Sequence, residues 1–117
     1  MTRTVHFDSE RRFELIYNGV MQGAIIAQQQ YAKENQRPLP FDKQRLLARI
    51  VRKLKSISST KPEDVTRRDF IPGSLNFTQE EFDHIIMLYE KVDWVPSIVD
   101  EVVDVHEWFS SADKVDG

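Results

Sequence analysis

The residues that come closest to a catalytic or metal-binding pattern are histidines with carboxylates nearby. Glu81 and His84 form one Glu-x-x-His pair, and Glu80 stands one helical turn before His84. A di-iron carboxylate bundle needs two such pairs together with two further glutamates from facing helices. The sequence holds no second Glu-x-x-His, and the carboxylate of Asp104 is too close in sequence to His106 to make one. We therefore expect no metal site.

A row of carboxylates near the C-terminus is the second candidate for chemistry. Asp100, Asp104 and Glu107 follow one another at spacings of four and three, which places them on one face of a helix. Hydrolysis by two carboxylates needs them to flank a cleft in different environments, and nothing in the sequence indicates one. The ordinary interpretation is a solvated acidic face. The alternatives are a face that docks a basic partner or one that mimics the phosphates of a nucleic acid.

Basic side chains gather in the middle of the chain. Residues 43–75 carry nine basic and three acidic side chains, whereas residues 76–117 carry two basic and eleven acidic ones. Within the basic part, four cations line one side of an expected helix: Arg45, Arg49, Arg52 and Lys53. This face is solvated, or pairs with the acidic part of the same chain, or binds phosphate or an acidic protein.

The composition excludes several classes of protein. At 117 residues, with 40% hydrophobic and 30% charged side chains, the chain suits one folded domain with a modest core. The absence of cysteine rules out disulfides, thiolate zinc sites and cysteine nucleophiles, and fits a cytoplasmic setting. The motifs of P-loop, dinucleotide-binding and Gly-x-Ser-x-Gly enzymes are missing as well. We therefore expect no enzymatic activity, no catalytic residues and no cofactor.

The elements that carry these residues are expected to be helices. Apolar residues recur at spacings of three and four, which is a helical period, in four segments: 13–31, 46–57, 82–92 and 98–109. The clearest helix boundary precedes the third segment, where Thr78 and Glu81 form a Thr-x-x-Glu capping box. Phe77 and Phe82 occupy the positions of a hydrophobic staple around this cap.

These segments predict an all-α fold, a small bundle of four principal helices in a single helical domain over residues 1–117. Residues 1–7 are expected to form an N-terminal arm, and residues 110–117 to fray. The connection over residues 58–76 is expected to hold a short fifth helix near 61–68, because Thr60, Pro62 and Glu63 resemble a capped helix start.

Two glycines in the first helix indicate a close contact between helices. Gly19 and Gly23 each cost roughly 1 kcal/mol relative to alanine in a helix interior, and with Ala27 they form a small-residue face. This face predicts tight packing against another helix of the chain, or the seam of a homodimer. The charge-free stretch over residues 15–32 holds too many amides to cross a membrane, so we expect no membrane span.

Elimination favours a non-enzymatic interaction protein, such as an adaptor, assembly factor or regulator that binds another protein. One alternative is a nucleic-acid-binding protein that uses the basic second helix, and another is a phosphate-mimicking inhibitor that uses the acidic last helix.

Trp94 and Trp108 flank the last helix, either buried or as anchors of an interface. Within that helix, Val99 and Val103 are expected to face the core.

Overall fold

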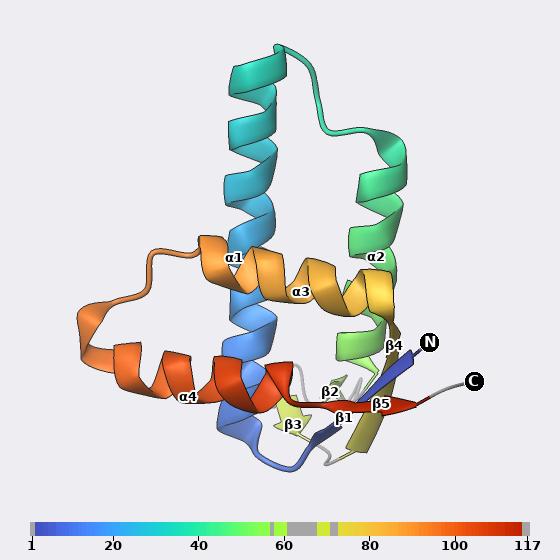
Figure 1. Cartoon of the computed structure of the whole chain (residues 1–117), viewed down its shortest axis with the longest axis vertical. Helices are drawn as coiled ribbons and strands as arrows, with labels where there is room; N and C mark the ends of the chain where they lie inside the picture. The colour runs from blue at the N-terminus through green and yellow to red at the C-terminus, as the bar shows by residue number, and fades with distance from the viewer. Residues whose placement is uncertain (1, 57, 61–67, 71–72, 116–117) are drawn as a thin grey trace.

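The fold combines helices with a small β-sheet (Figure 1). The computed structural model describes residues 2–56, 58–60, 68–70 and 73–115. The elements in chain order are β1 (Thr2–Phe7), α1 (Glu10–Asn35), α2 (Phe41–Lys55), β2 (Ser58–Thr60), β3 (Arg68–Phe70), β4 (Gly73–Thr78), α3 (Gln79–Lys91), the 3-10 helix η1 (Pro96–Ile98), α4 (Val99–Ser110) and β5 (Asp113–Val115). The predicted all-α bundle of four helices is therefore wrong, because the chain also builds a sheet.

The sheet is antiparallel, with strand order β4-β1-β5. Its central strand is the segment predicted to be an N-terminal arm, and β5 lies in the segment predicted to fray. Val5 pairs with Leu75 of β4, and Thr4 pairs with Asp113 of β5. The helical periods of the sequence did not reveal this sheet because its strands are short and their partners lie far away in sequence.

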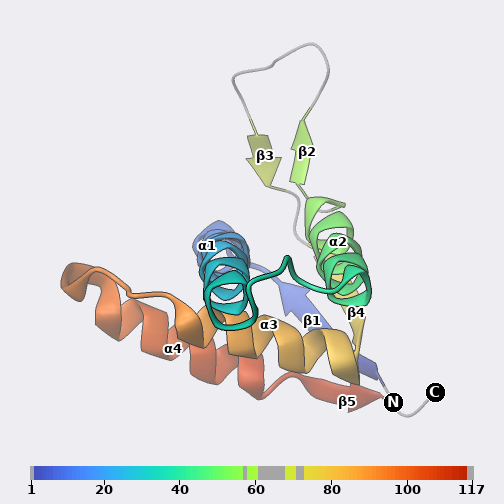
Figure 2. The ribbon, with the colours of Figure 1, turned by 90° about the horizontal axis from the view of Figure 1, so that it is seen from above.

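A separate pair of strands, β2 and β3, follows α2 and projects away from the rest of the chain (Figure 2). Its register pairs Ser58 with Phe70. The short helix predicted near 61–68 lies outside the described residues except for Arg68, which begins β3.

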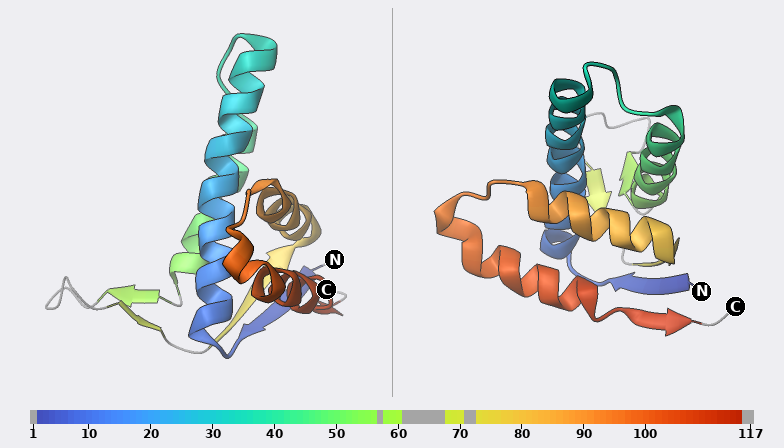
Figure 3. Two further views of the ribbon diagram at one scale, coloured as in Figure 1. Left: turned by 90° about the vertical axis from the view of Figure 1, so that its left-hand side faces the viewer. Right: turned by 45° about the horizontal axis from the view of Figure 1, so that its top comes forward.

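The helices stack against one another on the sheet. Figure 1 shows α1 and α2 side by side with α3 crossing both, and α4 returning beneath α3, as the views in Figure 3 confirm. The capping box at the start of α3 is confirmed: the Glu81 amide donates to Thr78 Oγ1, and the Thr78 amide donates to Glu81 Oε1. Among the described residues, no helix is long and apolar enough to cross a membrane.

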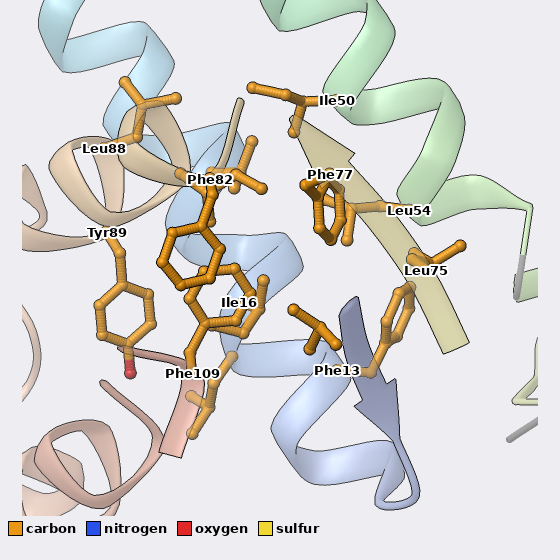
Figure 4. Packing of buried hydrophobic residues seen from close by; sticks show 14 of the residues in the cluster. Phe13, Ile16, Ile50, Leu54, Leu75, Phe77, Phe82, Leu88, Tyr89 and Phe109 are labelled. Carbon is orange, nitrogen blue, oxygen red and sulfur yellow. The ribbon is translucent and has the colours of Figure 1, made fainter. Parts of the chain in front are cut away.

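The core lies between the sheet and the helices (Figure 4). One face of the sheet buries Val5, Phe7 and Phe77. The rings of Phe82 in α3 and Phe109 in α4 stack with their centroids 4.8 Å apart, joining these two helices beside the sheet. The staple residues Phe77 and Phe82 are thus part of the main core as well as of the start of α3.

The helices α1 and α3 cross in close contact at Gly23. A Cβ atom on Gly23 would lie 2.1 Å from the carbonyl oxygen of Leu88, which is part of the backbone of α3. One at Gly19 would lie 2.5 Å from a ring carbon of Tyr89. Only residues without a side chain allow α1 to come this near to α3.

The crossing predicts that even one methyl group at Gly23 destabilises the fold. Alanine gains roughly 1 kcal/mol of helix propensity over glycine. The clash with a backbone carbonyl outweighs that gain, so we expect Gly23→Ala to lower the free energy of unfolding by about 1–3 kcal/mol. Urea denaturation measures the change, with Gln22→Ala on the exposed side of α1 as the control. A Gly23→Ala variant as stable as the wild type would contradict this crossing.

Candidate protein-interaction site

An open groove of about 320 Å³ lies between α1, α2 and α3. Its lining includes the later turns of α1, which extend past α3, above that helix in Figure 1. Its lining is mainly apolar and comes from all three helices, with Ala24, Ala27 and Tyr31 from α1, Leu47 from α2, and Met87 and Leu88 from α3.

The groove exists because α1 is longer than the core that it packs on. Its first half buries Phe13, Ile16 and Val20, whereas its last turns extend beyond α3. The small side chain of Ala27, one turn after the Gly23 crossing, leaves room between α1 and the neighbouring helices. Met87 remains 40% exposed there, so part of the apolar lining is in contact with water.

Basic groups border this apolar lining. Lys43 of α2 and Lys91 of α3 both line the groove, and Lys91 Nζ donates to Gln30 Oε1 at 3.2 Å. Glu34 contributes one carboxylate. Burial and the nearby charge of Lys43 lower the pKa of His84 below its ordinary value of 6.5, with Glu80 opposing them, so this imidazole is neutral at pH 7.

A basic surface continues from Lys43 along the outer side of α2. Arg45, Arg49 and Arg52 line an open depression there, and all three are exposed. The guanidinium of Arg45 lies 5.0 Å from the ring centroid of Phe41, which is itself 67% exposed. These three arginines with Lys43 form what we call the α2 basic face.

Lys53, predicted to belong to that face, instead points towards the third helix. Its Nζ lies 2.5 Å from Glu81 Oε1 and also donates to the Asn76 carbonyl oxygen at 2.9 Å. Glu81 is only 1% exposed, and Arg49 Nε lies 3.9 Å from its second carboxylate oxygen. Burial by itself raises the pKa of Glu81, but the hydrogen bonds from Lys53 and Thr78 and the charge of Arg49 together lower it. This carboxylate therefore ties α2 to the start of α3.

The Glu-x-x-His pair is divided between two surroundings. Glu81 is taken up by Lys53 and the helix cap, whereas His84 lines the groove. Among the described residues, no group of three or more potential metal ligands comes together.

The acidic residues of α4 lie at the surface. Asp100, Asp104 and Glu107 are exposed and form no ion pair within the part of the chain that the structure describes. Beside them, Val99 is 40% and Val103 48% exposed, so their predicted place in the core is wrong. The helix instead buries Val102, Val105 and Phe109. The run of valines did not tell these two sides apart, because both carry apolar residues at helical spacing.

The two tryptophans are half-buried and take part in internal packing. Trp94 Nε1 donates to the Tyr89 carbonyl oxygen at 3.1 Å. The ring of Trp108 meets that of Phe7 edge-on at 5.5 Å between centroids. Of the small-residue face, Gly19 and Gly23 contact α3 of the same chain, and Ala27 lines the groove.

Comparison of the chain with protein-family models, curated proteins and solved structures found no match. The groove and the α2 basic face are therefore interpreted from their own chemistry.

The buried carboxylate predicts that Lys53→Met destabilises the protein by about 2–3 kcal/mol. Removing one partner of a fully buried ion pair costs about 3–5 kcal/mol, and water around Lys53, which is 35% exposed, reduces the loss. Arg52→Met, which removes an exposed cation from the same helix, should change stability by no more than about 0.5 kcal/mol. Equal stabilities of the two variants in urea would show that the ion pair does not hold α2.

The ion pair between Lys53 and Glu81 also makes the stability of the protein depend on pH. Because the pKa of Glu81 is lower in the folded state than its ordinary value of 4.5, its contribution to stability is present above that value. The contribution is lost as the pH falls through the folded pKa. Wild type should therefore lose more stability on acidification than Lys53→Met.

The groove predicts opposite shifts of the His84 pKa for two neighbouring substitutions. Lys43→Met should raise this pKa by removing a repulsive charge, and Glu80→Gln should lower it by removing an attractive one. Burial, the largest cause of the shift, stays the same in both variants. An NMR titration of the imidazole protons measures the pKa, and shifts of the same sign would contradict the placement of these groups.

Proposed function

We propose that this chain is a non-enzymatic interaction protein whose groove and α2 basic face bind an acidic, apolar segment of another protein. The observation that carries the proposal is the continuity of the two surfaces through Lys43, which lines both. A cytoplasmic partner fits the cysteine-free sequence.

The apolar lining supports a protein partner. Helices that bind in grooves insert apolar side chains spaced by three or four residues, and a trough between three helices suits such a row. Met87 and Phe41 are large apolar side chains that stay exposed at the groove and on the basic surface next to it. Such residues often supply much of the binding energy of an interface once they are desolvated.

The charges support an acidic partner. Lys43 and Lys91 border the groove, and Arg45 and Arg52 form no ion pair with any described residue. Carboxylates on a bound segment would therefore meet cations on two sides of its apolar row.

Nucleic-acid binding is the second candidate, since the exposed arginines of α2 would also suit phosphates. Three features weigh against it: the chain has a net charge of −3, Glu80 interrupts the basic depression, and phosphates gain nothing from an apolar groove.

A direct test uses a short synthetic amphipathic helix with leucines at spacings of three and four, flanked by glutamates. We expect the wild-type protein to bind this peptide and not its lysine counterpart in fluorescence anisotropy. Met87→Asp puts a negative charge into the groove, which repels the glutamates of the peptide. This variant should bind the peptide about tenfold or more weakly, equivalent to about 1.4 kcal/mol.

The matched control is Met21→Asp, because Met21 is 39% exposed and Met87 is 40% exposed, but Met21 lies on α1 outside the groove. An equal loss of peptide affinity in Met87→Asp and Met21→Asp would overturn the proposal. So would a wild-type protein that does not bind the acidic peptide. Salt-sensitive binding of mixed-sequence duplex DNA that is lost on Arg45→Glu and unaffected by Met87→Asp would favour the nucleic-acid function instead.

A further inference from the structure

The exposed side of α4 has the chemistry that the groove is proposed to accept. Val99 is 40% and Val103 48% exposed, and they lie one turn apart on α4. Asp100, Asp104 and Glu107 accompany them on the exposed side of α4. We call these five residues the α4 ridge.

The ridge and the groove are complementary in two respects. The ridge carries two exposed valines beside carboxylates, and the groove is a concave apolar trough beside the α2 basic face. Because the ridge carboxylates and Arg45 and Arg52 lack internal ion pairs among the described residues, both sets of charge are free to pair elsewhere. We infer that the α4 ridge of one copy binds the groove and the α2 basic face of a second copy of this chain, an inference that rests on the proposed function.

The contact has to be intermolecular. The later turns of α1, which line the groove, and α4 lie on opposite sides of α3 (Figure 1). Helix α4 is held in its place by the burial of Val102, Val105 and Phe109. A hydrogen bond of 2.7 Å from Tyr89 Oη to the Val102 carbonyl oxygen adds to this. A ridge that is held there cannot reach the groove of its own chain.

The contact is also heterologous, since it joins two different surfaces. Each copy in a pair keeps one free groove and one free ridge, so further copies add head to tail until a ring closes or a filament grows. This arrangement gives a role to the segregated charge, because the basic middle of one copy meets the acidic C-terminal part of the next.

The experiment uses two variants, each altered on one surface only. Met87→Asp changes the groove, and Val103→Asp changes the ridge; both positions are exposed, so circular dichroism should show wild-type folding. In light scattering at low salt, the mass of the wild type should rise with concentration well above 13.7 kDa and fall again at high salt. Each variant alone should stay monomeric, with self-association weakened by about tenfold or more.

The decisive sample is the equimolar mixture of these two variants. The intact ridge of Met87→Asp can bind the intact groove of Val103→Asp, while the two altered surfaces carry like charges and repel each other. The mixture should therefore form dimers near twice 13.7 kDa that do not grow further with concentration. Met21→Asp, altered outside both surfaces, should assemble like the wild type.

A wild type that is monomeric at all concentrations, or a mixture that stays monomeric, would overturn the inference. Dimers of the wild type that persist unchanged in both variants would also overturn it, because they would use another surface. The proposed function is judged separately by the acidic peptide: a monomeric protein that binds this peptide in its groove retains the proposed function and loses only the self-association.

Discussion

The contact between the backbones of α1 and α3 at Gly23 determines where the groove proposed to bind a partner lies. It holds the two helices at a distance that no side chain at this position would allow, since a Cβ atom would come within 2.1 Å of the Leu88 carbonyl oxygen. Beyond this point α1 continues past α3, and the small residue one turn further on, Ala27, leaves space instead of filling it. Leu88 takes part in both features, because its carbonyl meets α1 and it is among the residues that line the groove. The groove thus follows from a crossing that is fixed by packing.

The position of α2, which forms the other wall of the groove, depends on a second contact. The carboxylate of Glu81 caps α3 and at the same time receives Lys53 from α2. The cations of α2 therefore have two different roles. Lys53 neutralises a buried charge, whose removal from water would otherwise be costly. Arg45 and Arg52 remain in water, where they add little to stability and are available to a partner.

Local patterns in the sequence predicted the helices well and the sheet not at all. The Thr78–Glu81 capping box marked the start of α3 because its partners are three residues apart. The strands β1 and β5 pair across the length of the chain, and no local period reports such pairing. For the candidate site, spacing alone predicted that the arginines of α2 share one exposed side of that helix. It predicted the same for the acidic row of α4. Spacing could not show that Lys53 pairs with Glu81 while the arginines stay exposed, because that depends on how α2 packs against α3. Nor could it show that Val102 is buried and Val99 exposed, because that depends on how α4 packs on the core.

Self-association and partner binding would use one groove, so each limits the other. A groove that is occupied by the α4 ridge of a neighbouring copy is closed to a partner, and the apparent affinity for the partner falls in proportion to the fraction of free grooves. In a head-to-tail chain, only the copy at one end keeps a free groove, and its ridge is engaged. A partner that binds the groove therefore caps one end and shortens the chain. Because both contacts combine opposite charges with apolar side chains, raising the salt concentration weakens both, and the balance between them is set by the fit of the apolar row in the groove.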